Sequence, residues 1–210
     1  MFEAEWQKLK FDFDNLNSNF ETHIDRRPNE QMCRLLILGE DHRYNIHPGV
    51  DPIAICRALW RTYFCRRPEG GSTIAMQLVR TISGRYEKTP TRKILEIVLA
   101  VRLTKHVDRE RLPCLYLWVA YYGWRMNNFL QACDRLSIDP NSSSLEDAAQ
   151  LVARLKYPEP RISNLERKRK IEVRCAYLAN RYRNRGNRLR TELAGSDGTV
   201  QSTGATGKIN

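Results

Sequence analysis

Apolar side chains recur every three or four residues along most of the chain, and this spacing predicts a mainly helical protein. The first stripe covers residues 2–20, where the opposite side mixes acidic and basic side chains. A helix that lies on a membrane would favour a basic polar face, so we expect this helix to dock onto the rest of the domain. The stripe consists of Phe2, Trp6, Leu9, Phe13, Leu16 and Phe20.

Capping signals divide the rest of the chain into further helices. Thr89 followed by Pro90, a capping box at residues 144–147, and Asn164 each mark a helix start. The single candidate for strands is a short hairpin near residues 83–88. The predicted fold class is therefore mainly α, with at most this hairpin. Helices are expected over residues 32–38, 52–64, 89–101, 108–123, 144–155 and 164–185, and one more begins at residue 73.

The composition indicates three parts. Residues 1–30 form the amphipathic helix and a linker, residues 31–185 form one domain, and residues 186–210 are rich in Gly, Ser and Thr and are expected to be disordered. No apolar run approaches the roughly 18 residues that span a bilayer. The first residues also lack the basic and apolar regions of a signal peptide. We therefore expect a soluble or membrane-peripheral chain.

The charge and cysteine content refine this picture. The net charge of +11 and the sequence pI of about 9.6 suit an anionic partner, such as nucleic acid, an anionic membrane surface or a phosphorylated ligand. None of the six cysteines forms a C-x-x-C pair, and most lie in apolar helical patterns. We expect buried free thiols. They are Cys33, Cys56, Cys65, Cys114, Cys133 and Cys175.

An adjacent pair of carboxylates, Glu40 and Asp41, directly follows the apolar run of residues 35–38. A carboxylate in partly dry surroundings can have its pKa raised and act as a general base. A solvated turn with a helix cap explains the same pair. Both interpretations remain open on this stretch alone.

Two later stretches offer sites for an anion. Gly70 and Gly71 lead into a helix start, where unpaired N–H groups favour phosphate, although an ordinary capped helix would have the same sequence. Glu96 is the one carboxylate in an otherwise apolar helix, and Arg92 and Lys93 lie on its side. A structural ion pair is the alternative explanation for this group.

Taken in order, three stretches resemble the signatures of the peptidoglycan glycosyltransferases, glycosyltransferase family 51. Residues 40–49 resemble E-D-x-x-F-x-x-H-x-G, residues 70–80 resemble G-G-S-T-I-x-Q-Q-x-x-K, and residues 92–96 match R-K-x-x-E. The resemblance covers residues 35 to 165. The departures are Tyr44 for Phe, Met76 for Gln, Arg80 for Lys, Cys114 for Glu and Trp118 for Asn.

The resemblance implies a lysozyme-like helical domain that polymerises lipid II into glycan strands and releases undecaprenyl pyrophosphate. Glu40 would be the general base, Asp41 and His47 would support it, and Glu96 would help stabilise the leaving pyrophosphate through a divalent cation, Mg or Mn, or through nearby cations. Thr73 and Gln77 would line the donor site. The residues expected to bind substrate are His47, Gly70, Gly71, Ser72, Thr73, Gln77, Arg80, Arg92 and Lys93.

The same resemblance implies partners and a location. These are lipid II, the growing glycan strand, an anionic membrane surface and other cell-wall synthesis proteins, at the periplasmic face of a bacterial inner membrane. Three alternatives remain: a non-catalytic or retuned member that binds lipid-linked or polymeric glycan, a glycan hydrolase that uses Glu40 as an acid, and a nucleic-acid-binding protein motivated only by charge.

Overall fold

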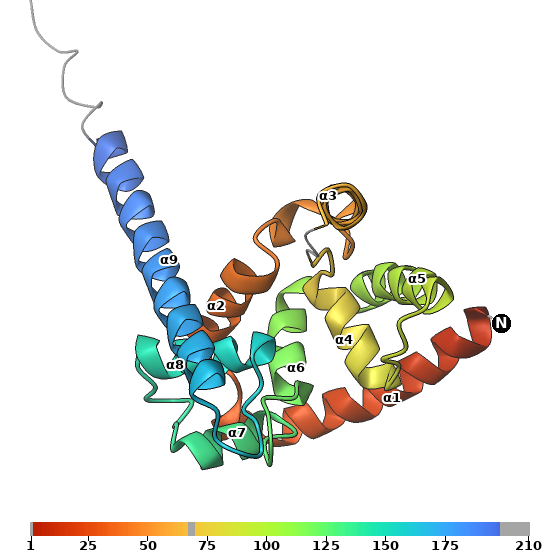
Figure 1. The fold of residues 1–210 in the computed structure, drawn as a ribbon, viewed down its shortest axis with the longest axis horizontal. Helices are drawn as coiled ribbons and strands as arrows, with labels where there is room; N and C mark the ends of the chain where they lie inside the picture. Colours follow the sequence, from red (N-terminus) through yellow and green to blue (C-terminus); the bar gives the residue numbers. More distant parts are fainter. Residues whose placement is uncertain (1, 67–69, 198–210) are drawn as a thin grey trace, which may run out of the picture.

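A computed structural model describes residues 2–66 and 70–197 of the protein. The fold is a bundle of helices (Figure 1). Within these ranges no strand is formed, and isolated bridges join Gly123 to Met126 and Glu159. The predicted mainly helical class is confirmed. The α-helices are α1 (Phe2–Thr22), α2 (Glu30–Glu40), α3 (Pro52–Tyr63), α4 (Ile74–Ser83), α5 (Pro90–His106), α6 (Leu112–Val119), α7 (Phe129–Leu136), α8 (Leu145–Lys156) and α9 (Leu165–Asp197).

Helix α6 lies at the centre of the core. It contacts α1, α2, α4 and α7, and its side chains Leu112, Leu115 and Leu117 are fully buried. Helix α6 is therefore covered on all sides, in accord with its almost continuous apolar sequence. The site residues on α2 and α4 are thus held against one common element.

Helix α1 docks onto the domain, as its mixed polar face predicts. Leu9, Phe13 and Phe20 are buried, and α1 packs against α4, α5 and α6. Glu5 also forms an ion pair with Arg85, at 2.6 Å between carboxylate and guanidinium. In Figure 1, α1 runs along one edge of the molecule below α4 and α6.

The predicted caps are confirmed. The Thr89 hydroxyl accepts from the backbone N–H of Arg92, Ser144 forms a capping box with Asp147, and Asn164 caps α9. The hairpin considered near residues 83–88 is absent. Gly84 instead ends α4 in the left-handed conformation, with φ at +64°, and an unpaired connection leads to α5.

The end of α9 differs from the prediction. We expected the helix to stop at residue 185 and a disordered tail to begin at 186, but α9 continues to Asp197. A single glycine at position 186 weakens a helix without ending it. The rest of the predicted tail, residues 198–210, lies outside the described residues. Figure 1 shows α9 beside α2 and α8 at its start and projecting from the body at its end.

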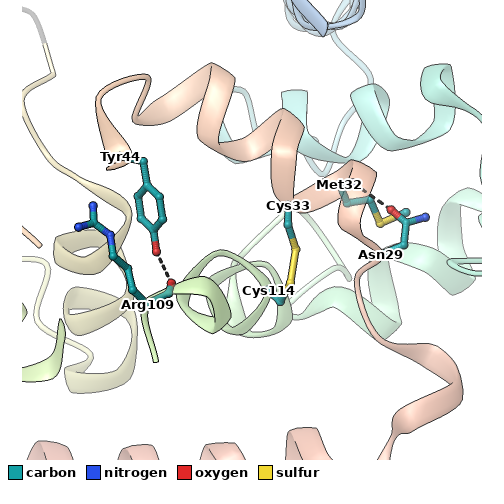
Figure 2. The surroundings of a disulfide bond; sticks show 6 residues. All are labelled: Asn29, Met32, Cys33, Tyr44, Arg109 and Cys114. Carbon is teal, nitrogen blue, oxygen red and sulfur yellow. Dashed lines mark hydrogen bonds between the residues drawn. A yellow bond between two sulfur atoms is a disulfide. The ribbon is translucent and has the colours of Figure 1, made fainter. Parts of the chain in front are cut away.

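The prediction of free buried thiols is wrong for four cysteines. Cys33 of α2 and Cys114 of α6 form a disulfide with a Cα–Cα distance of 5.6 Å, because the two helices pack with these positions opposed (Figure 2). Cys56 and Cys65 are exposed thiols, on α3 and just after it. Cys133 is buried and free, as expected, and Cys175 is partly buried and free.

Candidate active site

The first predicted motif lies at the end of α2. Glu40 is the last residue of this helix, and its carboxylate lies 2.9 Å from Nη2 of Arg174, which belongs to α9. Figure 2 shows the chain continuing from α2 to Tyr44, whose ring points toward Arg109. The Tyr44 hydroxyl donates to the Arg109 carbonyl, and the Arg109 guanidinium lies over the Tyr44 ring at 4.6 Å. Tyrosine therefore anchors this turn at a position where the motif has phenylalanine.

Asp41 joins the first motif to the second. Its Oδ1 lies 2.9 Å from Nε2 of His47, and its Oδ2 accepts a hydrogen bond from the backbone N–H of Ile74 at 3.2 Å. The side chains of Asp41 and His47 are both buried. Because Ile74 begins α4, the carboxylate occupies the positive end of that helix. Asp41 and His47 thus fix the position of Glu40 relative to α4.

Thr73 and Gly49 strengthen the same connection. The Thr73 hydroxyl caps α4 by accepting from the N–H of Met76 and donates to the carbonyl of Gly49 at 2.6 Å. Gly49 has φ at +89°, and a Cβ there would lie 2.1 Å from the hydroxyl of Thr104 on α5. Only glycine fits this approach. The end of the first motif is therefore packed between α4 and α5.

The second and third motifs meet at Lys93. Its ammonium donates to the hydroxyl of Ser72 at 2.8 Å and to Oε1 of Glu96 at 2.7 Å. Arg92 donates to Oε2 of the same carboxylate, which is buried. Glu96 thus holds two cations beside the start of α4. The buried carboxylate is paired, as its cost in isolation requires.

The surroundings of Lys93 shift its pKa. Burial lowers the pKa of Lys93 below its ordinary value, against the opposing hydrogen bond and negative charge of Glu96. The positive charges of Arg80 and Arg92 lower it as well. Arg80, the predicted phosphate ligand of α4, therefore belongs to the same cluster of cations. We name Arg80, Arg92 and Lys93 the cation cluster.

Tyr116 of α6 is buried, and charged site residues influence its hydroxyl. Burial raises the pKa of the Tyr116 hydroxyl, the negative charge of Glu40 raises it further, and the positive charge of Arg80 opposes that rise. The three motifs form one site through the bonds of Asp41 to Ile74 and of Lys93 to Ser72 and Glu96.

The remaining predicted residues lie in the segment before α4 and on α4 itself. A Cβ on Gly71 would lie 2.9 Å from the carbonyl of Ala54 and 3.0 Å from Ala58, so this glycine permits close packing onto α3. A Cβ on Gly70 would meet nothing within 4 Å. Gln77 is buried in the second turn of α4. Gly71 thus has a packing role.

Three departures from the family motifs lie in the interior. Met76 is fully buried in the core, and Cys114 is in the disulfide. Trp118 packs edge-on against Phe20 of α1 and donates from Nε1 to Asn19 at 3.2 Å. These side chains repack the core and anchor α1. They therefore give no support to the retuned, non-catalytic alternative.

The described side chains do not form a ready metal site. Both Glu96 oxygens accept from Arg92 and Lys93, and no group of three His, Cys, Asp or Glu side chains in the described ranges is arranged to hold a metal ion. The groups that surround Glu96 are the cations Arg92 and Lys93. Their positive charges do not suit the binding of a divalent cation, which prefers oxygen ligands. Mg or Mn at Glu96 stays a prediction from the sequence.

Sequence reasoning missed Arg174 and Tyr116. Arg174 lies in an arginine-rich helix and belongs to none of the three motifs. Its spacing is nevertheless informative, because it falls three residues after Ile171 and four before Leu178, both of which are buried. Tyr116 also lies outside the three motifs.

A helical domain that places a carboxylate near a cluster of cations has the arrangement of an enzyme acting on a phosphate-bearing substrate. The comparison with family profiles specifies the class. The profile of the transglycosylase family matches residues 14–183, so the chain belongs to the transglycosylase family. The lysozyme-like helical fold expected from the motifs is consistent with this membership.

The names of similar proteins agree with this family. A biosynthetic peptidoglycan transglycosylase of Alcanivorax borkumensis is 34% identical over 131 residues, covering 61% of this chain and 54% of that protein. Penicillin-binding protein 1A of Aquifex aeolicus is 35% identical over 109 residues, covering 51% and 15%. A monofunctional glycosyltransferase of Staphylococcus saprophyticus is 37% identical over 87 residues, covering 41% and 32%. The chain thus spans about half or less of the length of these relatives.

Proposed function

We propose that this protein is a peptidoglycan glycosyltransferase that polymerises lipid II and releases undecaprenyl pyrophosphate. One observation carries the proposal: Asp41, next to Glu40, binds the start of α4, and Lys93 joins Ser72 to Glu96, so the three motifs come together. Glycosyl transfer from a pyrophosphate needs a base for the acceptor and positive charge for the leaving group. The site supplies both, in a chain of the transglycosylase family.

Glu40 acts as the base in this proposal. The acceptor hydroxyl attacks the anomeric carbon of the lipid-linked donor while its proton passes to the Glu40 carboxylate. A bond forms from the acceptor oxygen to the anomeric carbon, and the bond from that carbon to the pyrophosphate oxygen breaks. Asp41 and His47 hold the turn that follows Glu40 in place through their buried hydrogen bond.

The cation cluster receives the charge of the leaving group. Lys93 and Arg92 are held by Glu96, and Arg80 lies within reach of Lys93. Because these groups are fixed before the substrate binds, little reorganisation is needed as the pyrophosphate departs.

Helix α3 supports a peripheral position on the membrane that holds the lipid donor. No helix in the described ranges is long and apolar enough to cross a bilayer. However, Trp60 is 59% exposed and Phe64 is 71% exposed, and their rings stack at 4.3 Å. Exposed aromatic side chains favour the interface between water and lipid. Figure 1 shows α3 at the periphery of the bundle.

The disulfide supports an oxidising location. Bonds such as Cys33–Cys114 persist outside the cytosol, for example in the bacterial periplasm. We therefore propose that the enzyme acts at the periplasmic face of the inner membrane, where the growing glycan strand is its second substrate.

Polymerisation of lipid II in detergent tests the proposal. Wild type should form glycan strands, and Glu40→Gln should lower the rate at least ~100-fold, the order expected for a general base. Glu30→Gln is a matched control, because Glu30 lies on the same helix in an exposed ion pair with Arg34. Equal rates for Glu40→Gln and wild type would remove Glu40 from the base role. No product with wild type would overturn the proposed activity.

A further inference from the structure

Arg174 reaches Glu40 from the far end of the sequence. Its Nη2 donates to the Gly39 carbonyl at 2.8 Å and to Oε1 of Glu40 at 2.9 Å. The Arg174 side chain is 11% exposed, and that of Glu40 is 20% exposed. One guanidinium nitrogen thus joins the backbone and the carboxylate at the end of α2. The carboxylate keeps part of its surface open to solvent.

Gly39 makes this contact feasible. A Cβ at position 39 would lie 2.7 Å from Cδ2 of Leu178 and 3.0 Å from Nη2 of Arg174. Leu178 is fully buried where α9 meets α2. The missing side chain at position 39 therefore lets α9 approach closely enough to bring its arginine to the carboxylate.

The other face of Arg174 is also held. Its Cζ lies 5.2 Å from the ring centre of Tyr177, and Arg181 lies near the same ring at 5.8 Å. Tyr177 thereby restricts the side chain of Arg174 from the next turn of α9. The arginine is fixed by a carbonyl, a carboxylate and a ring.

Few other charged groups act on Glu40. From α6 it faces Tyr116, and its chain neighbour Asp41 is bonded to His47 and Ile74. Helix α8 also packs on α2, but its own charged side chains have other partners. These pairs are Arg154 with Glu159 and Glu146 with Arg183. Arg174 is the cation that the structure places on the Glu40 carboxylate.

We propose that Arg174 is a positioning residue for Glu40, because it fixes one carboxylate oxygen of the proposed base. This inference rests on the proposed function. The guanidinium restrains rotation of the carboxylate, so the remaining oxygen is presented to the acceptor hydroxyl.

The kinetics of lipid II polymerisation test this role. In Arg174→Gln we expect kcat to fall about 10-fold while the KM for lipid II stays nearly unchanged, because the base is misplaced and the cations of the donor site are untouched. Arg174→Lys keeps the charge and should restore part of kcat, since a point donor replaces the planar fork. Arg183→Gln is the matched control, because Arg183 lies on α9 like Arg174 and pairs with the exposed Glu146 of α8. An unchanged kcat in Arg174→Gln, or a change confined to KM, would overturn the proposal.

A second measurement does not depend on catalysis. The guanidinium ¹⁵N resonance of Arg174, assigned by its absence in Arg174→Gln, should move in Glu40→Gln, because the charged acceptor at 2.9 Å is replaced by an amide. The same resonance should stay in place in Glu30→Gln, which changes an exposed carboxylate on the same helix as Glu40. An Arg174 resonance that is the same in Glu40→Gln and wild type would overturn the pairing. Inactive wild type with a displaced Arg174 resonance in Glu40→Gln would instead overturn only the proposed activity.

Discussion

Asp41 and His47 share a buried hydrogen bond of 2.9 Å, although the exposed residues His42, Asn45 and Ile46 lie in the turn between them. The bond closes the turn after α2, and the second oxygen of Asp41 binds the start of α4. Position 41 therefore needs two acceptor oxygens, since both neighbours present N–H groups.

Asp41→Asn should therefore destabilise the protein. The amide NH2 of asparagine would face either the Ile74 N–H or His47, which leaves a buried donor without an acceptor. We expect a loss of about 1–3 kcal/mol in the free energy of unfolding. Urea denaturation measures this loss. Asp134→Asn, which breaks an exposed ion pair with Arg26, should cost less than about 1 kcal/mol. Equal effects of the two changes would contradict the structural role of Asp41.

Lys93 should make donor binding sensitive to alkaline pH. Because burial lowers its pKa, the ammonium loses its proton at a lower pH than an ordinary lysine. The KM for lipid II should then rise on the alkaline side, as the positive charge beside the pyrophosphate is lost. Lys93→Arg stays charged in this range and should abolish the rise. Lys88→Arg, at an exposed position, serves as control. An alkaline rise that persists in Lys93→Arg would show that another group causes it.

Glu96 should contribute to the reaction by holding Arg92 and Lys93, and not by binding a metal ion. Since its oxygens bind Arg92 and Lys93, Glu96→Gln should reduce polymerisation by about 10-fold or more, as expected for loss of about 1.4 kcal/mol of transition-state stabilisation. If Mg or Mn increases the polymerisation rate, the rate should rise by the same factor in the variant and in wild type. Titration with each metal after treatment with a chelator measures this. Stimulation that is lost only in Glu96→Gln would support the metal-ligand role predicted from the sequence.

The disulfide should stabilise the fold. Cys33 and Cys114 are 81 residues apart, and a loop of this size gives about 4 kcal/mol in the chain-entropy account. Cys33→Ser/Cys114→Ser should lose about this amount relative to oxidised wild type in denaturant unfolding. Reduced wild type should match the double variant. Cys56→Ser, at an exposed thiol, should change little. Identical unfolding of oxidised and reduced wild type would contradict the bond.

Helix α3 should carry binding to anionic vesicles. Replacing both Trp60 and Phe64 by serine removes the stacked pair, and we expect at least 10-fold weaker co-sedimentation with phosphatidylglycerol vesicles, given roughly 1.5–3 kcal/mol for each large apolar side chain transferred from water. Phe11→Ser changes an equally exposed aromatic residue on α1 and should have little effect. Loss of binding with Phe11→Ser alone would transfer the contact to α1.

The helices with side-chain caps could be predicted from local sequence. Thr89, Ser144 and Asn164 each cap a helix where expected, because a cap depends on residues only three positions apart. The disulfide could not be predicted, because sequence spacing does not show which helix faces meet. The prediction of a hairpin near residues 83–88 was wrong, because Gly84 ends α4 and the segment that follows it forms no strand.

The candidate site was predicted from motifs, and its connections came only from tertiary contacts. The pairing of Lys93 with Ser72 joins residues 21 positions apart, and that of Arg174 with Glu40 joins residues 134 apart. On α9 the apolar side chains of Val173 and Tyr177 are exposed, and Arg174 lies on the inner face instead. Local sequence could not show this, because the side of α9 that faces α2 depends on tertiary packing.

The bond between Cys33 and Cys114 also closes a covalent ring. Every site residue from Glu40 to Glu96 lies inside that ring, whereas Arg174 lies outside it. A protease that cuts once after exposed Arg66 would therefore separate the first motif from the second along the chain without releasing either. The nicked protein would keep its full mass until the sulfur–sulfur bond was reduced.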